Sequence, residues 1–288
     1  MGFPAGSSLD LNARTLAEPL AHILGQPVVV ENKVGAGGNI AADAVVRATD
    51  EHTLGLMING NLTTARLLNP RLPFDPIKDL RPVSLLCTAP LVLVVPANSP
   101  FQSLNDLISE GARAGSRWSY GSPGVGTLGH LGMEWLQSLT GLAAVHVPYP
   151  GYAQVATAMI GGQIQLSFMP PGLAQAQVKA GKLRALAVST RGRSTLVPDV
   201  PGMGESGLAG FDLEVWNALA APIGMPEPRA QALGERVAEL LRQKPVRDAF
   251  FAQGWQVAGT PPEGLKNRIL ADRKVFGPLI QKLKLAQR

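Results

Sequence analysis

The sequence predicts an α/β protein made of two lobes, with the chain crossing between them twice. Hydrophobic residues recur with helical spacing in several segments, and short continuous apolar runs typical of buried strands lie between them. Glycine-rich and proline-rich stretches separate these segments, where turns are expected. One series of strands and helices ends near Pro96, a second follows, and a last strand near Trp216 leads into helices only. Alternation of this kind favours βαβ units with parallel strands.

Composition narrows the function classes. A chain of 288 residues, 45% hydrophobic and 16% charged, is long enough for two ordinary folded domains. The net charge of +5 comes with no basic run interleaved with aromatic residues, so we expect no nucleic-acid partner. No stretch approaches the roughly 20 apolar residues of a membrane span, so we expect the chain not to be membrane-embedded. Cys87 is the single cysteine, and His22 and His52 have no partner at ligand spacing, so we expect no disulfide, metal or cofactor.

The first lobe is expected to begin with a turn and a helix that ends at Gly25, a natural stop. Its elements are expected in this order: helix 8–24, buried strand 28–31, helix 40–48, strand 53–58, an irregular proline-rich stretch 67–78 and a long buried strand 83–96.

The second lobe is expected to begin after a linker, and the chain then returns to the first. The elements expected are helix 104–114, a strand running into Ser122, a helix after it, strand 143–147, helix 152–160, strand 163–168, helix 174–180, strand 185–190, return strand 211–221 and helices 226–241, 245–251 and 261–284. The predicted domains are therefore 1–98 plus 217–288 for lobe 1 and 99–216 for lobe 2. Two crossings make a hinge, and we expect a small molecule to bind in the cleft between the lobes.

The segment Trp118–His130 is the most informative loop of the chain. A strand runs into small residues, and the loop opens directly into an amphipathic helix. Ser122 and Thr127 provide hydroxyl groups, and we expect Thr127 to cap the helix. Unpaired N–H groups and the helix dipole at such a start favour negative charge. The sequence therefore predicts a carboxylate-binding loop.

The same loop contains Gly124, Gly126 and Gly129 in a Gly-x-Gly-x-x-Gly pattern, which leaves open a nucleotide-dependent α/β enzyme. A dinucleotide site also requires an acid about 20 residues further on, and the next strand instead ends in Pro148–Gly151. Ser122 and His130 share the loop without a carboxylate nearby, and no Gly-x-Ser-x-Gly elbow is present. We therefore expect no catalytic residues and no enzymatic activity. A sensory regulator is a further alternative, but no segment remains for a DNA-binding helix-turn-helix.

Several blocks of residues occur in an order that resembles one known family. They are Phe3-Pro-Ala-Gly-Ser-Ser-Leu-Asp-Leu-Asn-Ala-Arg14, Gln26-Pro-Val-Val-Val-Glu-Asn32, Gly35-Ala-Gly-Gly-Asn-Ile40, Pro82-Val-Ser-Leu-Leu86, His146-Val-Pro-Tyr149, Ala180-Gly-Lys-Leu-Arg-Ala-Leu-Ala187 and Pro198-Asp-Val-Pro201. Together they resemble the Bug-type substrate-binding proteins of tripartite tricarboxylate transporters, and the resemblance covers essentially the whole chain.

This resemblance implies a type II periplasmic binding protein fold whose two lobes close on a small organic carboxylate. It implies a monomeric periplasmic receptor, without cofactor, that delivers its ligand to a membrane permease. The ligand carboxylate is then held by backbone N–H groups, hydroxyls and waters. Carried over by position, the ligand-binding residues are Phe3, Ala5, Gly6, Ser7, Ser8, Asp10, Asn59, Gly60 and Asn61 from lobe 1, and Ser122, Thr127, Leu128, Gly129, His130, Tyr149, Gly151, Phe168, Met169 and Pro170 from lobe 2.

The chain departs from the family pattern in two places. Members usually carry an acid after the residue matching Phe168, where this chain has Met169. Because Met cannot meet a ligand amine, we expect a plainer or more apolar acid rather than an amino acid. The family also carries a strand directly before Phe3 and a leader before that strand, so we expect the sequence to be truncated ahead of Met1.

Other interpretations remain open for several residues. Ser7 and Ser8 have the alternative of capping the first helix, and Asp10 that of complementing its dipole. His146 is expected to be structural because it lies in a strand, and Trp216 is expected in the core.

Overall fold

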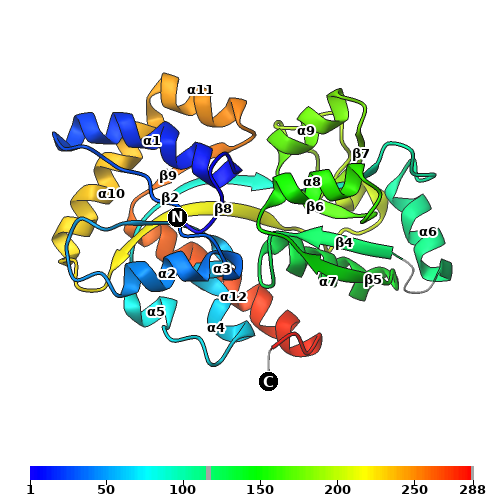
Figure 1. Ribbon diagram of the computed structural model, residues 1–288, viewed down its shortest axis with the longest axis horizontal. Helices are drawn as coiled ribbons and strands as arrows, with labels where there is room; N and C mark the ends of the chain where they lie inside the picture. Colours follow the sequence, from blue (N-terminus) through cyan, green and yellow to red (C-terminus); the bar gives the residue numbers. More distant parts are fainter. Residues whose placement is uncertain (115–117, 287–288) are drawn as a thin grey trace. The chain divides into compact units, whose positions relative to one another are not determined.

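The computed structural model describes residues 1–114 and 118–286, so the parts of the two expected lobes at 115–117 and 287–288 lie outside the described residues. The chain forms two compact units, Met1–Thr88 with Trp216–Arg288, and Ala89–Val215. It leaves the first unit within strand β2 (Leu80–Pro90) and returns within β8 (Glu214–Pro222) (Figure 1). Residues 89–98, which the sequence assigned to lobe 1, belong to the second unit, because β3 (Val92–Pro96) pairs with strands there.

The first unit contains a four-stranded sheet in the order β1-β8-β2-β9, where β1 is Gly55–Ile58 and β9 is Gln256–Thr260. In Figure 1 the yellow β8 runs beside the cyan β2. The pairs β1–β8 and β2–β9 are antiparallel, so the expectation of parallel strands is wrong here. The neighbours of β1 and β2 come from the last third of the chain, and alternation along the sequence does not identify such distant partners.

Helices cover this sheet. They are α1 (Ser8–Leu24), η1 (Ala36–Gly38), α2 (Asn39–Val46), α3 (Asn59–Thr63), α4 (Ala65–Leu68), α5 (Pro76–Asp79), α10 (Glu227–Arg242), α11 (Lys244–Ala252) and α12 (Pro262–Lys282). The proline-rich stretch 67–78 is thus not wholly irregular, since α4 ends in it and Asp75 caps α5 by accepting a hydrogen bond from the Ile77 N–H. The expected core position of Trp216 is confirmed: its side chain is fully buried in an apolar cluster with Phe74 and Leu265.

The expected buried strand at 28–31 is wrong. These residues are extended but belong to no strand, and 80% of Val29 is exposed. An apolar run forms a strand only where a neighbouring strand accepts its backbone hydrogen bonds. Within the described residues no such strand lies beside this segment, although its composition is strand-like.

The second unit contains a three-stranded antiparallel sheet in the order β6-β3-β7 and a parallel pair β4–β5. Its elements are α6 (Leu104–Ala114), β4 (Trp118–Ser122), α7 (Leu128–Thr140), β5 (Ala144–Pro148), α8 (Tyr152–Ile160), β6 (Ser167–Met169), α9 (Pro171–Lys179), β7 (Leu183–Val188) and η2 (Met203–Ser206). The expected βαβ unit around the Gly124–Gly129 loop is confirmed, because α7 connects the parallel strands β4 and β5.

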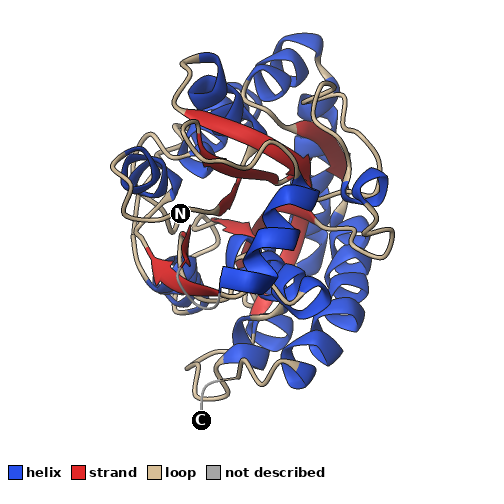
Figure 2. Cartoon of the chain, turned by 90° about the vertical axis from the view of Figure 1, so that its right-hand side faces the viewer, coloured by secondary structure: helices blue, strands red, loops and turns tan. Residues whose placement is uncertain are grey.

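Helices and strands recur throughout the described chain, as expected for an α/β protein (Figure 2). In the ranges that the structure describes, no helix is both long enough and apolar enough to cross a membrane.

Two candidate ligand-binding loops

In the first unit, the turn Phe3–Ser7 leads into α1. Ser7 caps the helix, with its hydroxyl accepting a hydrogen bond from the Asp10 N–H at 3.3 Å, so the capping interpretation is confirmed for Ser7. Gly6 lies at φ = +76°, a left-handed conformation that favours glycine and turns the chain into the helix. The Ser8 hydroxyl accepts a hydrogen bond from the Trp255 indole N–H at 2.8 Å. Ala5 and Gly6 are exposed, so the tip of this turn is open to solvent.

Asp10 supports this turn from behind. Its buried carboxylate accepts hydrogen bonds, each of 2.9 Å, from the Gly6 N–H, the Arg14 guanidinium and the Asn32 amide. Burial acts to raise the pKa of Asp10, but its three hydrogen bonds outweigh burial and hold the pKa below its ordinary value. Asn32 also donates to the Phe3 carbonyl at 3.0 Å. The carboxylate is thus occupied in shaping the turn, and the turn presents its backbone rather than an acid.

A second loop of the first unit lies beside this turn. Asn61 in α3 donates to the Gly37 carbonyl at 3.0 Å and to the Asn39 side chain at 2.9 Å. A Cβ at Gly38 would lie 2.9 Å from the Asn61 amide oxygen and 3.2 Å from the Phe3 ring, so these three residues are in close contact. Asn59 and Gly60 are buried at the start of the same helix. The lobe 1 site residues therefore lie on two segments, the turn leading into α1 and helix α3, and Gly38 contacts both.

In the second unit, the loop between β4 and α7 is fastened by hydroxyl groups. The Ser122 hydroxyl oxygen lies 3.1 Å from the Gly124 carbonyl and accepts from the Gly124 N–H at 3.2 Å, and the Thr127 hydroxyl donates to the Gly124 carbonyl at 2.8 Å. Thr127 stands at the N-cap of α7, but its side chain makes no capping hydrogen bond. The expected capping role of Thr127 is therefore wrong, because its hydroxyl is turned back into the loop.

This geometry leaves the first N–H groups of α7 available. The first residues of a helix have no acceptor within the helix itself. Leu128 and Gly129 are the first two residues of α7 and are buried, and among the described residues their N–H groups have no protein acceptor. Buried N–H groups are nearly always paired, so this helix start is suited to an anionic ligand.

Two histidines lie beneath the loop. The His146 Nε2 lies 2.7 Å from the Ser122 Oγ, and the His130 Nδ1 accepts a hydrogen bond from the Gly126 N–H at 3.4 Å. The two rings pack with centroids 4.4 Å apart. Burial lowers the pKa of both His130 and His146 to about 4, and for His146 the charge of His130 contributes further, so both are neutral at pH 7. They brace the loop without adding charge to it.

Tyr152 is a residue that the predicted site omitted. A Cβ at Gly129 would lie 2.5 Å from the Tyr152 hydroxyl oxygen and 3.4 Å from the Ser122 Cβ. Tyr152 is the first residue of α8, and burial raises the pKa of its hydroxyl, so the group stays protonated. From the sequence, Tyr152 was a candidate for lining the cleft, at a helix start after the Pro148–Gly151 turn.

The remaining site residues of the second unit differ in their surroundings. Tyr149 donates its backbone N–H to the Ser122 carbonyl at 2.9 Å, and Gly151 is the N-cap of α8. Phe168 stacks on Phe211 with centroids 5.9 Å apart. Met169 is fully buried in an apolar cluster, and Pro170 is the buried N-cap of α9. Met169 therefore packs into the core of the unit.

Neither a metal site nor a serine triad is assembled around these loops. Among the described residues there is no group of three or more His, Cys, Asp or Glu that could hold a metal ion. Ser122 and His146 are in contact, but the nearby Glu134 accepts a hydrogen bond from the Tyr120 hydroxyl at 2.5 Å. A nucleophile–base pair is activated by a third group that orients the base, and here that acid is engaged by Tyr120.

Sequence reasoning missed two residues that position the loops, Asn32 and Trp255. Asn32 ends one of the quoted family blocks, which was the one available signal for it. Trp255 reaches Ser8 from 247 residues away, and no local pattern indicates such a contact.

Comparison with known proteins assigns the chain to a family. Residues 12–285 match the model of the tripartite tricarboxylate transporter family receptor. BugT of Bordetella pertussis is 36% identical over 264 residues, which cover 91% of this chain and 81% of BugT. A structure of an R. palustris protein with adipate has a TM-score of 0.94 at 28% identity, covering 99% of this chain and 96% of the other. MatC of R. palustris with bound malate has a TM-score of 0.91 at 30% identity, covering 97% and 96%. The chain therefore belongs to the tripartite tricarboxylate transporter receptor family and has the two-lobed fold of its periplasmic binding proteins.

Proposed function

We propose that this protein is a periplasmic receptor that binds a small organic carboxylate and delivers it to the permease of a tripartite tricarboxylate-type transporter. The observation that carries the proposal is the helix start at Leu128 and Gly129, where two buried N–H groups face no protein acceptor in the described chain. The relatives with bound adipate and malate support an acid as the ligand.

In this proposal neutral donors hold the carboxylate. The N–H groups of Leu128 and Gly129 bind one carboxylate, and the neighbouring Tyr152 hydroxyl donates to it. The exposed turn at Ala5 and Gly6 is the candidate binding loop of the first unit, as the resemblance implies. Arg14 is engaged by Asp10 and supports the turn rather than the ligand.

The proposed role is transport, without catalysis. An acid shifts the protein toward its ligand-bound conformation only to the extent that it binds this conformation more tightly than the conformation of the empty protein. We further propose that the receptor acts as a monomer.

Thermal melting against a ligand panel tests this proposal. The panel contains mono-, di- and tricarboxylates, aromatic acids, the corresponding amides, and NAD. An acid present at about 100 times its dissociation constant adds roughly 2.7 kcal/mol, which raises Tm by about 5–10 °C.

We expect such a shift with one class of acid and none with its amide. A shift with NAD alone would contradict the proposal and favour a nucleotide enzyme built on Gly124, Gly126 and Gly129.

A further inference from the structure

The segment that builds the helix start of α7 contains no Lys or Arg. Residues 118–178 form β4, α7, β5, α8, β6 and most of α9, and their only basic side chains are those of His130 and His146. A buried anion is costly unless a positive charge or several hydrogen bonds accompany it. For a carboxylate bound at Leu128 and Gly129, these two imidazoles are the groups of the segment that can provide a positive charge.

Both imidazoles lie against the loop before α7. His146 of β5 is held to the loop by the 2.7 Å contact between its Nε2 and the Ser122 Oγ. His130 lies in the first turn of α7, and its Nδ1 accepts a hydrogen bond from the Gly126 N–H at 3.4 Å. Parallel pairing of β5 with β4 places His146 opposite Tyr120, in the strand from which the loop leaves. A negative charge at the start of α7 therefore acts on both rings.

The groups around His146 make it the better proton acceptor of the two. Among the described residues, the titratable groups that face it are His130 and Glu134 of α7 and Tyr120 of β4. Burial and the neighbouring His130 lower the pKa of His146 to about 4, and the negative charge of Glu134 acts in the opposite direction. Burial raises the pKa of Tyr120, so its hydroxyl stays protonated and donates to Glu134. His130 would lose the hydrogen bond from Gly126 if a proton were added at its Nδ1.

We propose that His146 takes up a proton from solvent when a carboxylate binds at the start of α7, so that binding of the acid is linked to pH. This linkage rests on the proposed receptor function and adds a regulation of the same site. The proton joins the unprotonated ring nitrogen of the neutral imidazole, and the imidazolium then donates from Nε2 to the Ser122 hydroxyl oxygen. The anion and the proton each raise the affinity for the other by the same factor.

The expected size of the linkage follows from the charge of the anion. An opposite charge within about 4–6 Å raises the pKa of a basic group by about 1–3 units. For His146, a rise of one to two units above about 4 means an uptake of about 0.4–0.8 proton at pH 5 and less than about 0.1 at pH 7.5. The affinity for the ionised acid then rises about two- to tenfold between pH 7.5 and pH 5.

Titration calorimetry in two buffers with different heats of ionisation counts the protons taken up for each bound acid. The probes are butyrate, adipate, citrate and benzoate, one for each class of acid in the melting panel. At pH 5 the unaltered protein should take up about 0.4–0.8 proton more than His146→Gln, and at pH 7.5 the difference should be below about 0.1. Because both proteins bind the same probe, any proton released by the probe cancels in this difference.

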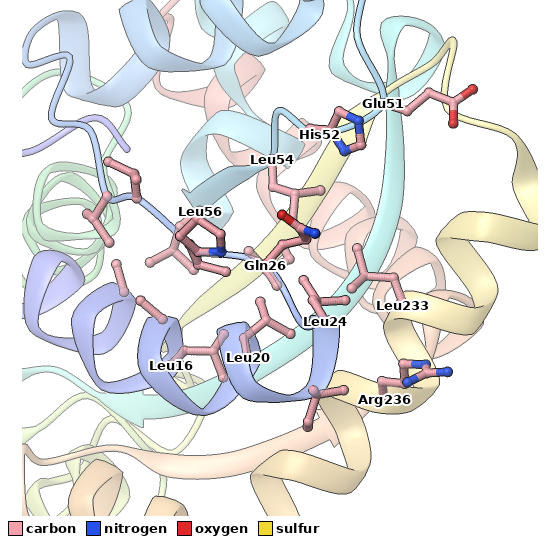
Figure 3. Close-up of a pocket in the computed structure, with 18 of the residues that line it drawn as sticks. Leu16, Leu20, Leu24, Gln26, Glu51, His52, Leu54, Leu56, Leu233 and Arg236 are labelled. Atoms are coloured by element: carbon pink, nitrogen blue, oxygen red, sulfur yellow. The ribbon is translucent and has the colours of Figure 1, made fainter.

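His52→Gln is the matched control. His52 is exposed in the first unit, where it lines a mainly aliphatic groove of about 610 Å³ (Figure 3) and lies 3.5 Å from the Arg229 guanidinium. The substitution removes one histidine without altering the loop before α7, so its proton count should equal that of the unaltered protein.

NMR titration of the histidine ring signals provides a second readout that needs no variant. With the acid bound, the pKa of His146 should rise by about one unit or more, and the His52 signal should follow one curve with and without the acid. Binding of an acid with equal proton counts in the unaltered and His146→Gln proteins, and no rise in the pKa of His146, would overturn the linkage and leave the receptor function intact. Binding of none of the four acids at either pH would contradict the proposed function, and the linkage with it.

Discussion

Hydroxyl groups in the loop before α7 act on the loop itself. Thr127 was expected to cap the helix, and instead its hydroxyl donates to the Gly124 carbonyl. The residue type and position were predictable from the sequence, but the direction of the hydroxyl was not, because a second acceptor three residues away competes with the cap. Ser7, in contrast, caps α1 as the sequence indicated.

Replacing Thr127 with Val should weaken ligand binding by roughly fivefold, since one hydrogen bond that orders the loop is worth about 1 kcal/mol. Tm should change little, because the Ser122 hydroxyl remains in contact with the Gly124 carbonyl. Titration calorimetry measures the affinity, and Thr157→Val serves as control, since the Thr157 hydroxyl donates to Ala153 on the exposed face of α8. Unchanged affinity in Thr127→Val would remove this hydroxyl from the account.

His146 illustrates a limit of local reasoning. Its place in a strand suggested a structural role, yet the fold brings it to Ser122 and to the ring of His130. Tyr120 stacks on both imidazoles, and Glu134 is hydrogen-bonded to the Tyr120 hydroxyl. Parallel pairing of β4 with β5 creates this cluster, and no spacing within either strand indicates it.

The two histidines predict a pH dependence of stability. Their pKa values are lowered from 6.5 to about 4 in the folded protein, so the unfolded chain binds protons first as the pH falls. The two histidines therefore cost the fold no stability above about pH 6.5, and the free energy of unfolding falls progressively as the pH drops from 6.5 toward 4. Melting curves between pH 4 and 8 should therefore show a decline in Tm below pH 6.5.

The variants His146→Gln and His22→Gln separate this effect from general acid unfolding. His146→Gln should flatten the decline, whereas His22→Gln, which alters an exposed residue of α1, should follow the parent curve. Parallel curves for all three proteins would show that the cluster is not the source of the pH dependence.

The helices and strands that could be predicted from the sequence are those with a single amphipathic face. Helix α1 begins and ends where the sequence indicated, because its apolar stripe, its cap and Gly25 are all local signals. Strand β9 was not predicted, and 28–31 was wrongly predicted as a strand. Both depend on whether a partner strand lies alongside, and a strand of four or five residues contains no information about its partner.

The packing of helix α7 requires that its second residue, Gly129, has no side chain. A Cβ on Gly129 would lie 2.5 Å from the Tyr152 hydroxyl oxygen and 3.3 Å from the Phe168 carbonyl. Gly129→Ala should therefore cost about 1–3 kcal/mol in the free energy of unfolding and reduce ligand affinity as Tyr152 is displaced.

Denaturant unfolding measures the first effect of Gly129→Ala and calorimetry the second. The matched control is Gly210→Ala in the same unit, where a Cβ meets nothing within 4 Å, and we expect a change within about 0.5 kcal/mol. A Gly129→Ala protein that is as stable and as tightly binding as the control would contradict the described packing of α7 against Tyr152.

For the whole molecule, the sequence predicted the family, but it predicted the arrangement of the candidate site only in part. Blocks spread over the chain indicated the receptor family, and residues 12–285 match its model. The sequence did not predict which backbone N–H groups of the loops are left for a ligand, because that depends on the direction in which the loop hydroxyl groups point. The structure shows the turn of the first unit fastened by the Asp10 carboxylate and its hydrogen-bond partners, and the loop of the second unit fastened by hydroxyl groups and the neutral His130–His146 pair.

The central claim is that these loops bind a carboxylate group. Titration calorimetry with the acid that gives the largest melting shift, beside its uncharged methyl ester, tests this claim most directly. We predict saturable binding of the acid with one site per chain, and no measurable binding of the ester, because buried N–H groups at a helix start favour an anion. Equal affinity for acid and ester, or binding of neither alongside binding of NAD, would contradict the account.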